Sequence, residues 1–258
     1  MHSTDEKLRA FKRLLEVMDE LRAKCPWDRE QTMESLRNLT IEETYELADA
    51  IIDQDLDEVR KELGDLMLHI VFYSKIGSEK GAFDMADVLN GVCDKLVFRH
   101  PHVFGELKVK DSGEVLENWE ELKMKEGNRS VLAGVPVSLP AMIKAHRIQD
   151  KVRAVGFDWE SRDQVWDKVR EEILEVQHEL NNGQEYDKME DEIGDLLFSV
   201  INAARLYSVE PETALERTNR KFIQRFNYLE SRAKEMNRSL KDMSLEEMEE
   251  IWQEAKSI

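Results

Sequence analysis

The sequence contains the same short motifs twice, in the same order and at nearly constant spacing. The matched pairs are "EETYEL" (42–47) with "EEILEV" (171–176), "KELGDLM" (61–67) with "DEIGDLL" (191–197), "KLVFR" (95–99) with "KFIQR" (221–225), and "WEELK" (119–123) with "WQEAK" (252–256). One such match arises easily by chance in so acidic a chain, but four in register do not. The pattern therefore predicts a duplicated unit of about 125 residues.

Apolar residues recur at the 3.6-residue period of an α-helix in nearly every long segment, and alternating β-branched runs are scarce. The expected helices are 4–23, 34–53, 55–79, 84–99 and 113–126 in the first half, and 139–154, 161–182, 184–208, 211–236 and 244–256 in the second. The segments expected to break helices are "CPWD", "GSEKG", "HPHVFG", "VGFDW", "NNG" and "EPE". The sequence thus predicts an all-α protein of two tandem helical bundles, 1–127 and 141–258, joined by a Gly-, Pro- and Ser-containing linker at 128–140.

The charge balance limits the classes of partner. There are 55 acidic and 37 basic residues, a net charge of −18, which disfavours binding to nucleic acid or to an anionic membrane. The two cysteines, Cys25 and Cys93, are far apart and belong to no paired motif, which argues against a disulfide framework or a structural zinc site. The N-terminus is unlike a signal peptide, and the apolar runs are too short to cross a bilayer. We therefore expect a cytoplasmic protein.

Carboxylates interrupt the most apolar segment of each half. In "KELGDLMLHIVFY" (61–73), apolar residues occupy almost the whole circumference of the expected helix, so that it would be buried nearly all round. Glu62, Asp65 and His69 lie together on one narrow strip of that helix. The corresponding residues of the second half are Glu192, Asp195 and Ser199. Because a buried carboxylate must be protonated, paired with a cation or bound to a metal, these strips indicate candidate cation sites.

The preceding helix supplies two more acids in each half. Glu43 and Glu46 share a helix face, as do Glu172 and Glu175. If each helix folds back on the next, two sets of carboxylates converge: Glu43, Glu46, Glu62 and Asp65, and Glu172, Glu175, Glu192 and Asp195. Such oxygen donors suit Mg²⁺, with Mn²⁺ as a possible substitute. Two such ions would activate water and assist an in-line displacement.

Two other interpretations of the acids remain open on the residues alone. They could form ion pairs with Lys or Arg in a non-catalytic helical scaffold. Glu175 and His178 also imitate half of the motif of carboxylate-bridged di-iron oxidoreductases, although no second Glu-x-x-His completes it. His69 and His178 are more typical of core or helix-edge histidines than of metal ligands.

Basic and aromatic residues recur beside the acids in both halves. Lys95 and Arg99, like Lys221 and Arg225, are four residues apart on one helix face, which suits either phosphate binding or plain solvation. Trp119 and Trp252 suit either a core or stacking on a base.

The motifs "EETYE…ELGDLMLH" and "EEILE…EIGDLLF", together with "CPWDREQT", "RHPHVFG" and "VGFDW", closely resemble the two-domain bacterial form of the MazG family of nucleoside triphosphate pyrophosphohydrolases. The resemblance covers essentially the whole chain. It implies helical bundles completed by homodimerisation, and Mg²⁺-dependent hydrolysis of ribo- or deoxyribonucleoside triphosphates to the monophosphate and pyrophosphate.

The resemblance also implies roles for individual residues. The family's metal ligands correspond to the four acids of each half, and those of the second half are the expected catalytic residues. Its nucleotide contacts correspond to Lys168, Glu171, Lys188, Lys221, Arg225, Trp252 and Lys256, and possible phosphate contacts of the first half are Lys95, Arg99, Trp119 and Lys123.

The two halves differ beside their acids. Lys168 and Lys188 each precede a second-half acid by one helical turn, whereas the equivalent first-half positions are Leu39 and Glu58. Two extra cations would attract a triphosphate, so we expect the second half to perform most of the hydrolysis. The alternative is that both lysines only form weak surface ion pairs.

Overall fold

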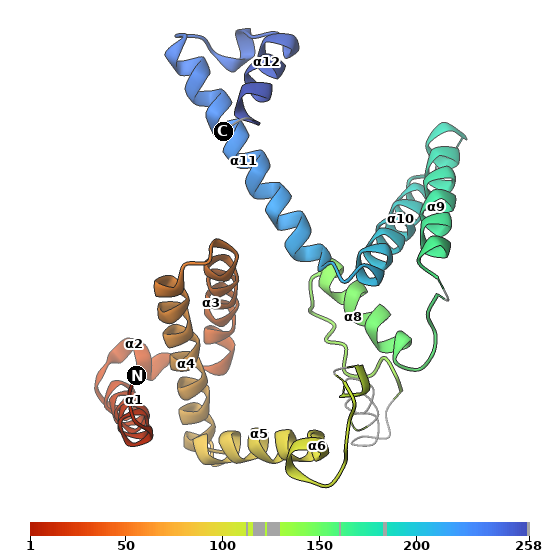
Figure 1. The fold of residues 1–258 in the computed structure, drawn as a ribbon. Helices are drawn as coiled ribbons and strands as arrows, with labels where there is room; N and C mark the ends of the chain where they lie inside the picture. The colour runs from red at the N-terminus through yellow and green to blue at the C-terminus, as the bar shows by residue number, and fades with distance from the viewer. Residues whose placement is uncertain (112, 116–121, 123–129, 160, 183–184, 257–258) are drawn as a thin grey trace. The chain divides into compact units, whose positions relative to one another are not determined.

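The computed structural model describes residues 1–258 except 112, 116–121, 123–129, 160, 183–184 and 257–258 (Figure 1). Helices and their connections make up the described residues, without any strand among them, so the predicted all-α fold is confirmed. The chain divides into two compact units, Met1–Asp111 and Ser112–Ile258. No helix among the described residues is long and apolar enough to cross a membrane.

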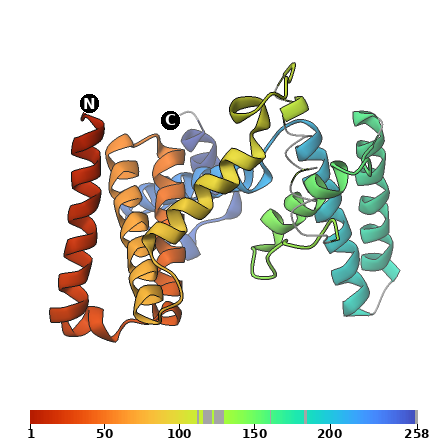
Figure 2. The ribbon, with the colours of Figure 1, turned by 90° about the horizontal axis from the view of Figure 1, so that it is seen from below.

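Unit 1 is built on a helical hairpin. The hairpin consists of α3 (Met33–Asp53) and α4 (Leu56–Glu79), which lie side by side in both ribbon views (Figures 1 and 2). Helix α1 (Thr4–Lys24) packs against α4, and the short α2 (Pro26–Glu30) leads from α1 to α3. Helices α5 (Met85–Arg99) and α6 (Pro101–Phe104) follow. The hairpin is therefore covered by α1 along part of α4.

Residues at the helix ends define the hairpin turn. Gln54 ends α3 in the left-handed conformation, with φ of 58°. The next residue, Asp55, caps α4, because its side chain accepts hydrogen bonds from the backbone N–H groups of Asp57 and Glu58. A two-residue turn leaves little freedom for the register of α3 against α4, and this register decides which side chains meet between them.

The core of unit 1 joins α1, α3 and α4. Its buried residues are Met18, Leu36, Val71, Phe72 and Ile76. The Arg22 guanidinium lies 5.5 Å from the centre of the Phe72 ring, pairs with Glu79, and donates a hydrogen bond of 3.1 Å to the Gln31 carbonyl oxygen. One arginine thus ties α1 both to the end of α4 and to the segment after α2.

Unit 2 repeats this plan with a longer final part. Helix α8 (Ala141–Arg153) packs against α10 of the hairpin formed by α9 (Arg162–Asn182) and α10 (Tyr186–Leu206). Helix α11 (Pro211–Glu235), a 3₁₀ turn (Leu240–Asp242) and α12 (Leu245–Ala255) complete the unit. Two core clusters hold it together: Val165, Val169 and Ala203 in the hairpin, and Leu229, Ala233, Met243 and Ile251 between α11 and α12.

The predicted breakers "CPWD" and "HPHVFG" do end α1 and α5, but each then begins a short helix that was not predicted. Helix α2 begins at Pro26 and α6 at Pro101. Proline suits the first turn of a helix, because its missing N–H would have no partner there. Residues 130–140 form turns and irregular backbone before α8. Most of the expected helix 113–126 lies outside the described residues.

An ion pair between the buried Arg205 and the more exposed Asp158 fixes the "VGFDW" loop to α10. Arg205 is 7% exposed; its Nη1 donates to Asp158 Oδ2 at 3.1 Å, and its Nη2 donates to Asn202 Oδ1 at 2.8 Å. Although burial by itself would raise the pKa of Asp158, hydrogen bonds from Arg205 and from the Trp159 N–H together lower it. The carboxylate is therefore stabilised in its charged form.

We predict that Asp158→Asn lowers the free energy of unfolding by about 3 kcal/mol at neutral pH, because it leaves the Arg205 charge buried without its partner. Since the folded-state pKa is the lower one, the contribution is present above the unfolded-state pKa and is lost as the pH falls through the folded-state pKa. Urea titrations should therefore show the difference between variant and wild type shrinking below about pH 4. Asp167→Asn is the control, because Asp167 pairs with Arg170 at an exposed site. A control loss as large as that of Asp158→Asn would contradict the prediction.

Candidate metal centres

The hairpin of unit 1 brings three carboxylates together. Glu43 on α3 and Glu62 and Asp65 on α4 each place an oxygen within 4.8 Å of the others. Glu62 is only 6% exposed, Glu43 is half-buried and Asp65 is exposed. This first acidic cluster therefore consists of one buried acid next to two acids that solvent can reach.

The first acidic cluster contains no compensating positive charge. Within the described part of the chain, neither Lys nor Arg forms an ion pair with its three acids, and Glu62 Oε2 is buried without a hydrogen-bond partner. Burial, followed by repulsion from Glu46 and Glu43, raises the pKa of Glu62. Burial, followed by repulsion from Asp65, raises the pKa of Glu43. The cluster thus favours an added proton or cation.

The hairpin of unit 2 forms the second acidic cluster in the same way. Glu172 on α9 and Glu192 and Asp195 on α10 have oxygens within 4.8 Å of one another. Glu172 is 4% exposed, and its Oε2 has no hydrogen-bond partner. Lys168 Nζ lies 2.7 Å from Glu172 Oε1 and 2.7 Å from Glu171 Oε1. Hydrogen bonds to Glu171 and Glu172 raise the pKa of Lys168, so this lysine remains charged.

The fourth predicted acid of each set lies beside its cluster rather than within it. Glu46 and Glu175 are absent from the two groups of close oxygens. Glu46 still contributes repulsion at Glu62 and Glu43. A hydrogen bond with Glu172, followed by burial, raises the pKa of Glu175. Both residues are therefore electrostatically coupled to their clusters.

The predicted nucleotide contacts are spread over several helices. Lys188 pairs with Glu185 at 3.1 Å, and not with Glu192 as its spacing suggested. Lys221 and Arg225 are one turn apart on α11, and neither has an ion-pair partner among the residues that the structure describes. The Trp252 ring centre lies 5.0 Å from that of Phe222, and Lys256 donates a hydrogen bond to the side-chain oxygen of Gln253.

In the first half, Lys95 is exposed and Arg99 half-buried on α5. Trp119 and Lys123 lie outside the described residues.

Comparison with known proteins identifies the family. The model of the MazG nucleotide pyrophosphohydrolase domain matches residues 31–104 and 161–229, which contain both acidic clusters. The chain belongs to the MazG family. The duplication deduced from the sequence therefore corresponds to two copies of the MazG domain.

Three relatives extend this likeness beyond the matched segments. The nucleoside triphosphate pyrophosphohydrolase of Escherichia coli (strain K12) is 43% identical over 252 residues, which span 95% of this chain and 96% of the relative. The nucleoside triphosphate pyrophosphohydrolase/pyrophosphatase MazG of Thermotoga maritima is 38% identical over 251 residues, 95% of either chain. The uncharacterized protein YabN of Bacillus subtilis (strain 168) is 45% identical over 259 residues, 98% of this chain and 53% of YabN.

A buried hydrogen-bond network distinguishes the first MazG hairpin from the second. The Thr40 hydroxyl donates to the Leu36 carbonyl oxygen, and its oxygen lies 2.9 Å from His69 Nδ1 and 2.7 Å from the Tyr73 hydroxyl. Because the hydroxyl proton of Thr40 is already used, His69 Nδ1 and Tyr73 act as donors. Burial lowers the pKa of His69, which keeps its ring neutral. This network was not predicted from the sequence. The pattern that indicates it is the pair of hydroxyl-bearing residues near His69, Thr40 on α3 and Tyr73 on α4.

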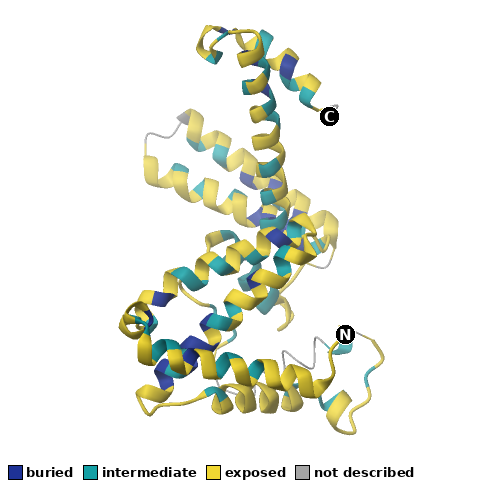
Figure 3. Cartoon of the chain, turned by 90° about the vertical axis from the view of Figure 1, so that its left-hand side faces the viewer, coloured by how far each residue is buried: buried dark blue, intermediate teal, exposed yellow. Residues whose placement is uncertain are grey.

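Each MazG hairpin exposes a row of apolar side chains on its second helix. Leu63, Met67 and Ile70 on α4 are 54%, 40% and 44% exposed, so unit 1 alone does not bury this helix all round. Ile193, Leu197 and Val200 form the equivalent exposed row on α10. Figure 3 shows exposed residues along much of each helix. Within each unit, the helix that carries two of the acids thus also carries a row of uncovered apolar side chains on another face.

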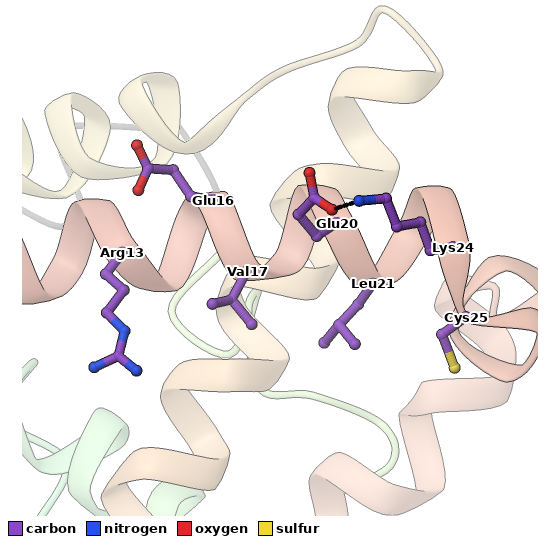
Figure 4. A pocket seen from close by; sticks show the side chains of 7 residues that line it. All are labelled: Arg13, Glu16, Val17, Glu20, Leu21, Lys24 and Cys25. Atoms are coloured by element: carbon purple, nitrogen blue, oxygen red, sulfur yellow. Dashed lines mark hydrogen bonds and ion pairs between the residues drawn. The ribbon is translucent and has the colours of Figure 1, made fainter.

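A pocket on unit 1 lies along α1, away from the acids (Figure 4). Its lining residues are Arg13, Glu16, Val17, Glu20, Leu21, Lys24 and Cys25. Its polar groups include the mutually paired Glu20 and Lys24, and none of its residues belongs to an acidic cluster. The acidic clusters, rather than this pocket, are therefore the candidate sites of chemistry.

We predict that Glu62→Gln makes the metal-free protein at least as stable as wild type at pH 7. The folded-state pKa of Glu62 is raised, so its charge destabilises the fold at high pH, and this penalty disappears as the pH falls toward the unfolded-state value near 4.5. Mg²⁺ should raise the melting temperature of wild type more than that of the variant. Calorimetry in EDTA and in Mg²⁺ provides the measurement. A variant that is less stable than wild type in EDTA would show that Glu62 has a structural partner.

Proposed function

We propose that this chain hydrolyses nucleoside triphosphates, with ribose or deoxyribose, to the nucleoside monophosphate and pyrophosphate. The observation that carries the proposal is the second acidic cluster, in which the buried Glu172 has an oxygen without a partner beside two further carboxylates. The names of the relatives from Escherichia coli and Thermotoga maritima, which match 95% of the chain, support the substrate class.

The donor atoms of both clusters fit a Mg²⁺ ion. They are all carboxylate oxygens, and each cluster contains a buried glutamate oxygen that lacks a protein partner. Mn²⁺ accepts the same ligands and is a possible substitute. When bound, the cation would supply charge neutralisation on the phosphate and activation of the attacking water. Glu172, Glu192 and Asp195 would hold it in the second half, and Glu43, Glu62 and Asp65 in the first.

Other residues of the second half would accept the proton of the attacking water and bind the negatively charged phosphates of the substrate. The water oxygen attacks the α-phosphorus. The bond between the α-phosphorus and the oxygen that bridges it to the β-phosphorus breaks, and pyrophosphate leaves. Glu175 would accept the proton of the water, because its raised pKa makes it a stronger base than an ordinary carboxylate. Lys168, Lys188, Lys221 and Arg225 would meet the negative charge of the phosphates, and Trp252 would stack on the base.

Neither alternative function has comparable support. An ion-paired scaffold would leave few acids without cations, yet the first acidic cluster has no basic partner among the described residues. The di-iron interpretation requires a histidine near the acids, and His178 is an exposed residue that belongs to neither cluster.

Paired substitutions test both the activity and the expected inequality of the halves. Glu172→Ala with Glu175→Ala should lower kcat/KM by at least about hundredfold, because it removes a proposed metal ligand together with the proposed base. The matched pair, Glu43→Ala with Glu46→Ala, should retain most of the activity. The measurement is pyrophosphate release from each triphosphate in the presence of Mg²⁺. Orthophosphate as the product would refute the reaction, and a larger loss in the first-half pair would place the main site in the first half.

We also propose that residues 1–127 and 141–258 act as two domains joined by 128–140, and that the chain works as a homodimer. The exposed rows Leu63–Met67–Ile70 and Ile193–Leu197–Val200 support a second copy as the cover, since rows of this kind are normally buried in an interface.

Leu197→Glu should therefore shift the mass measured by light scattering from dimer to monomer, because it places a charge in the proposed interface. Leu245→Glu is the matched control: Leu245 is also an exposed leucine, but it stands at the start of α12, a different helix from those that carry the rows. A monomeric wild type at micromolar concentration would refute the dimer.

A further inference from the structure

The two acidic clusters contain the same acids but differ in the residue that precedes them by one turn. Glu43, Glu62 and Asp65 correspond to Glu172, Glu192 and Asp195, and Glu42 corresponds to Glu171. Lys168 precedes the second set by one turn, whereas Leu39 stands at the same place in the first. Leu39 packs against the core of unit 1. At this position the two clusters therefore differ by one positive charge.

That charge lies on the carboxylate that a cation would use. Lys168 Nζ is 2.7 Å from Glu172 Oε1, and the Glu172 side chain is only 5% exposed, so the contact is shielded from water on one side. The other oxygen of Glu172 has no partner. A divalent cation that approaches this oxygen is repelled by the ammonium a few ångströms away. Moving the ammonium away from Glu172 would remove this repulsion.

The first acidic cluster presents no such obstacle. Glu62 Oε2 is buried and unpartnered, its neighbours are the acids Glu43 and Asp65, and no ammonium or guanidinium pairs with them in the described part of the chain. Each negative charge here adds to the attraction for a cation, and none is cancelled. A divalent ion without a bound nucleotide is therefore enough to relieve the repulsion among these acids.

We propose that the two clusters take up their divalent cation in different ways. The first binds the bare ion from solution, whereas the second binds it together with a triphosphate, whose oxygens give the Lys168 ammonium a new partner when it leaves Glu172. The second part of this inference rests on the proposed function, and the first part does not. Cation and triphosphate then bind the second cluster cooperatively, each increasing the affinity for the other.

Mn²⁺ binding, followed by electron paramagnetic resonance and calorimetry, tests the inference one cluster at a time. The Glu172→Gln protein reports on the first cluster and should bind Mn²⁺ without nucleotide. The Glu62→Gln protein reports on the second cluster and should bind Mn²⁺ about tenfold more weakly, until an α,β-methylene triphosphate is added. Equal affinity of the two proteins for Mn²⁺ without nucleotide would overturn the proposal.

Removal of Lys168 provides the decisive comparison. In the Glu62→Gln protein, Lys168→Gln should tighten Mn²⁺ binding about tenfold without nucleotide, since the competing charge is gone. Arg170→Gln is the control, because it removes the same charge from α9 but breaks only the exposed pair with Asp167. Circular dichroism verifies that each variant is folded.

The outcomes separate this inference from the proposed function. No gain with Lys168→Gln, or the same gain with Arg170→Gln, would overturn the role of Lys168 even if wild type releases pyrophosphate. Conversely, a wild type that binds Mn²⁺ as expected at the first cluster but releases no pyrophosphate would refute the function and leave the first part of the inference standing.

Discussion

The burial of a carboxylate inside an apolar helical hairpin is the constraint on which the rest of this structure depends. Glu62 and Glu172 each have an oxygen that is shielded from water and lacks a protein partner. A group of this kind destabilises the fold unless a proton or a cation joins it. The hairpin must therefore be held by other contacts, and in unit 1 these come from α1, through Met18 and the contacts of Arg22 with Phe72 and Glu79.

The duplicated hairpins meet this constraint in two ways. In the second, Lys168 lies against Glu172, and Val169 and Ala203 fill the adjacent hairpin core. In the first, Leu39 joins the hydrophobic core, and the Thr40–His69–Tyr73 network begins one helical turn after Asp65 on α4. The charged Lys168 of one copy is thus replaced by the apolar Leu39 in the other, which has the neutral network in addition. The fold accommodates both arrangements because the acids and their neighbours occupy equivalent helix positions in the two copies.

The helices, the duplication and the meeting of acids from successive helices could be predicted from sequence, because each follows from a period or a repeat. The choice of ion-pair partner could not. Lys188 has Glu185 and Glu192 at helical spacing and pairs with Glu185, and such choices depend on differences of a few tenths of a kcal/mol. The helices at Pro26 and Pro101 were missed because proline both ends helices and begins them. The apolar character of Leu63 predicts burial, but it does not say which chain covers the side chain.

The apolar row and the acids occupy different faces of the same helix, so one helix carries two separate surfaces. At 100° per residue, Leu63 is turned by about 100° from Glu62, and Met67 by about 160° from Asp65. The acids meet Glu43 of α3, whereas the row stays uncovered within unit 1. A second copy of the chain on the row would therefore leave the acids free to bind a cation. The proposed interface and the proposed metal centre would depend on the same helix, α4, without sharing a side chain.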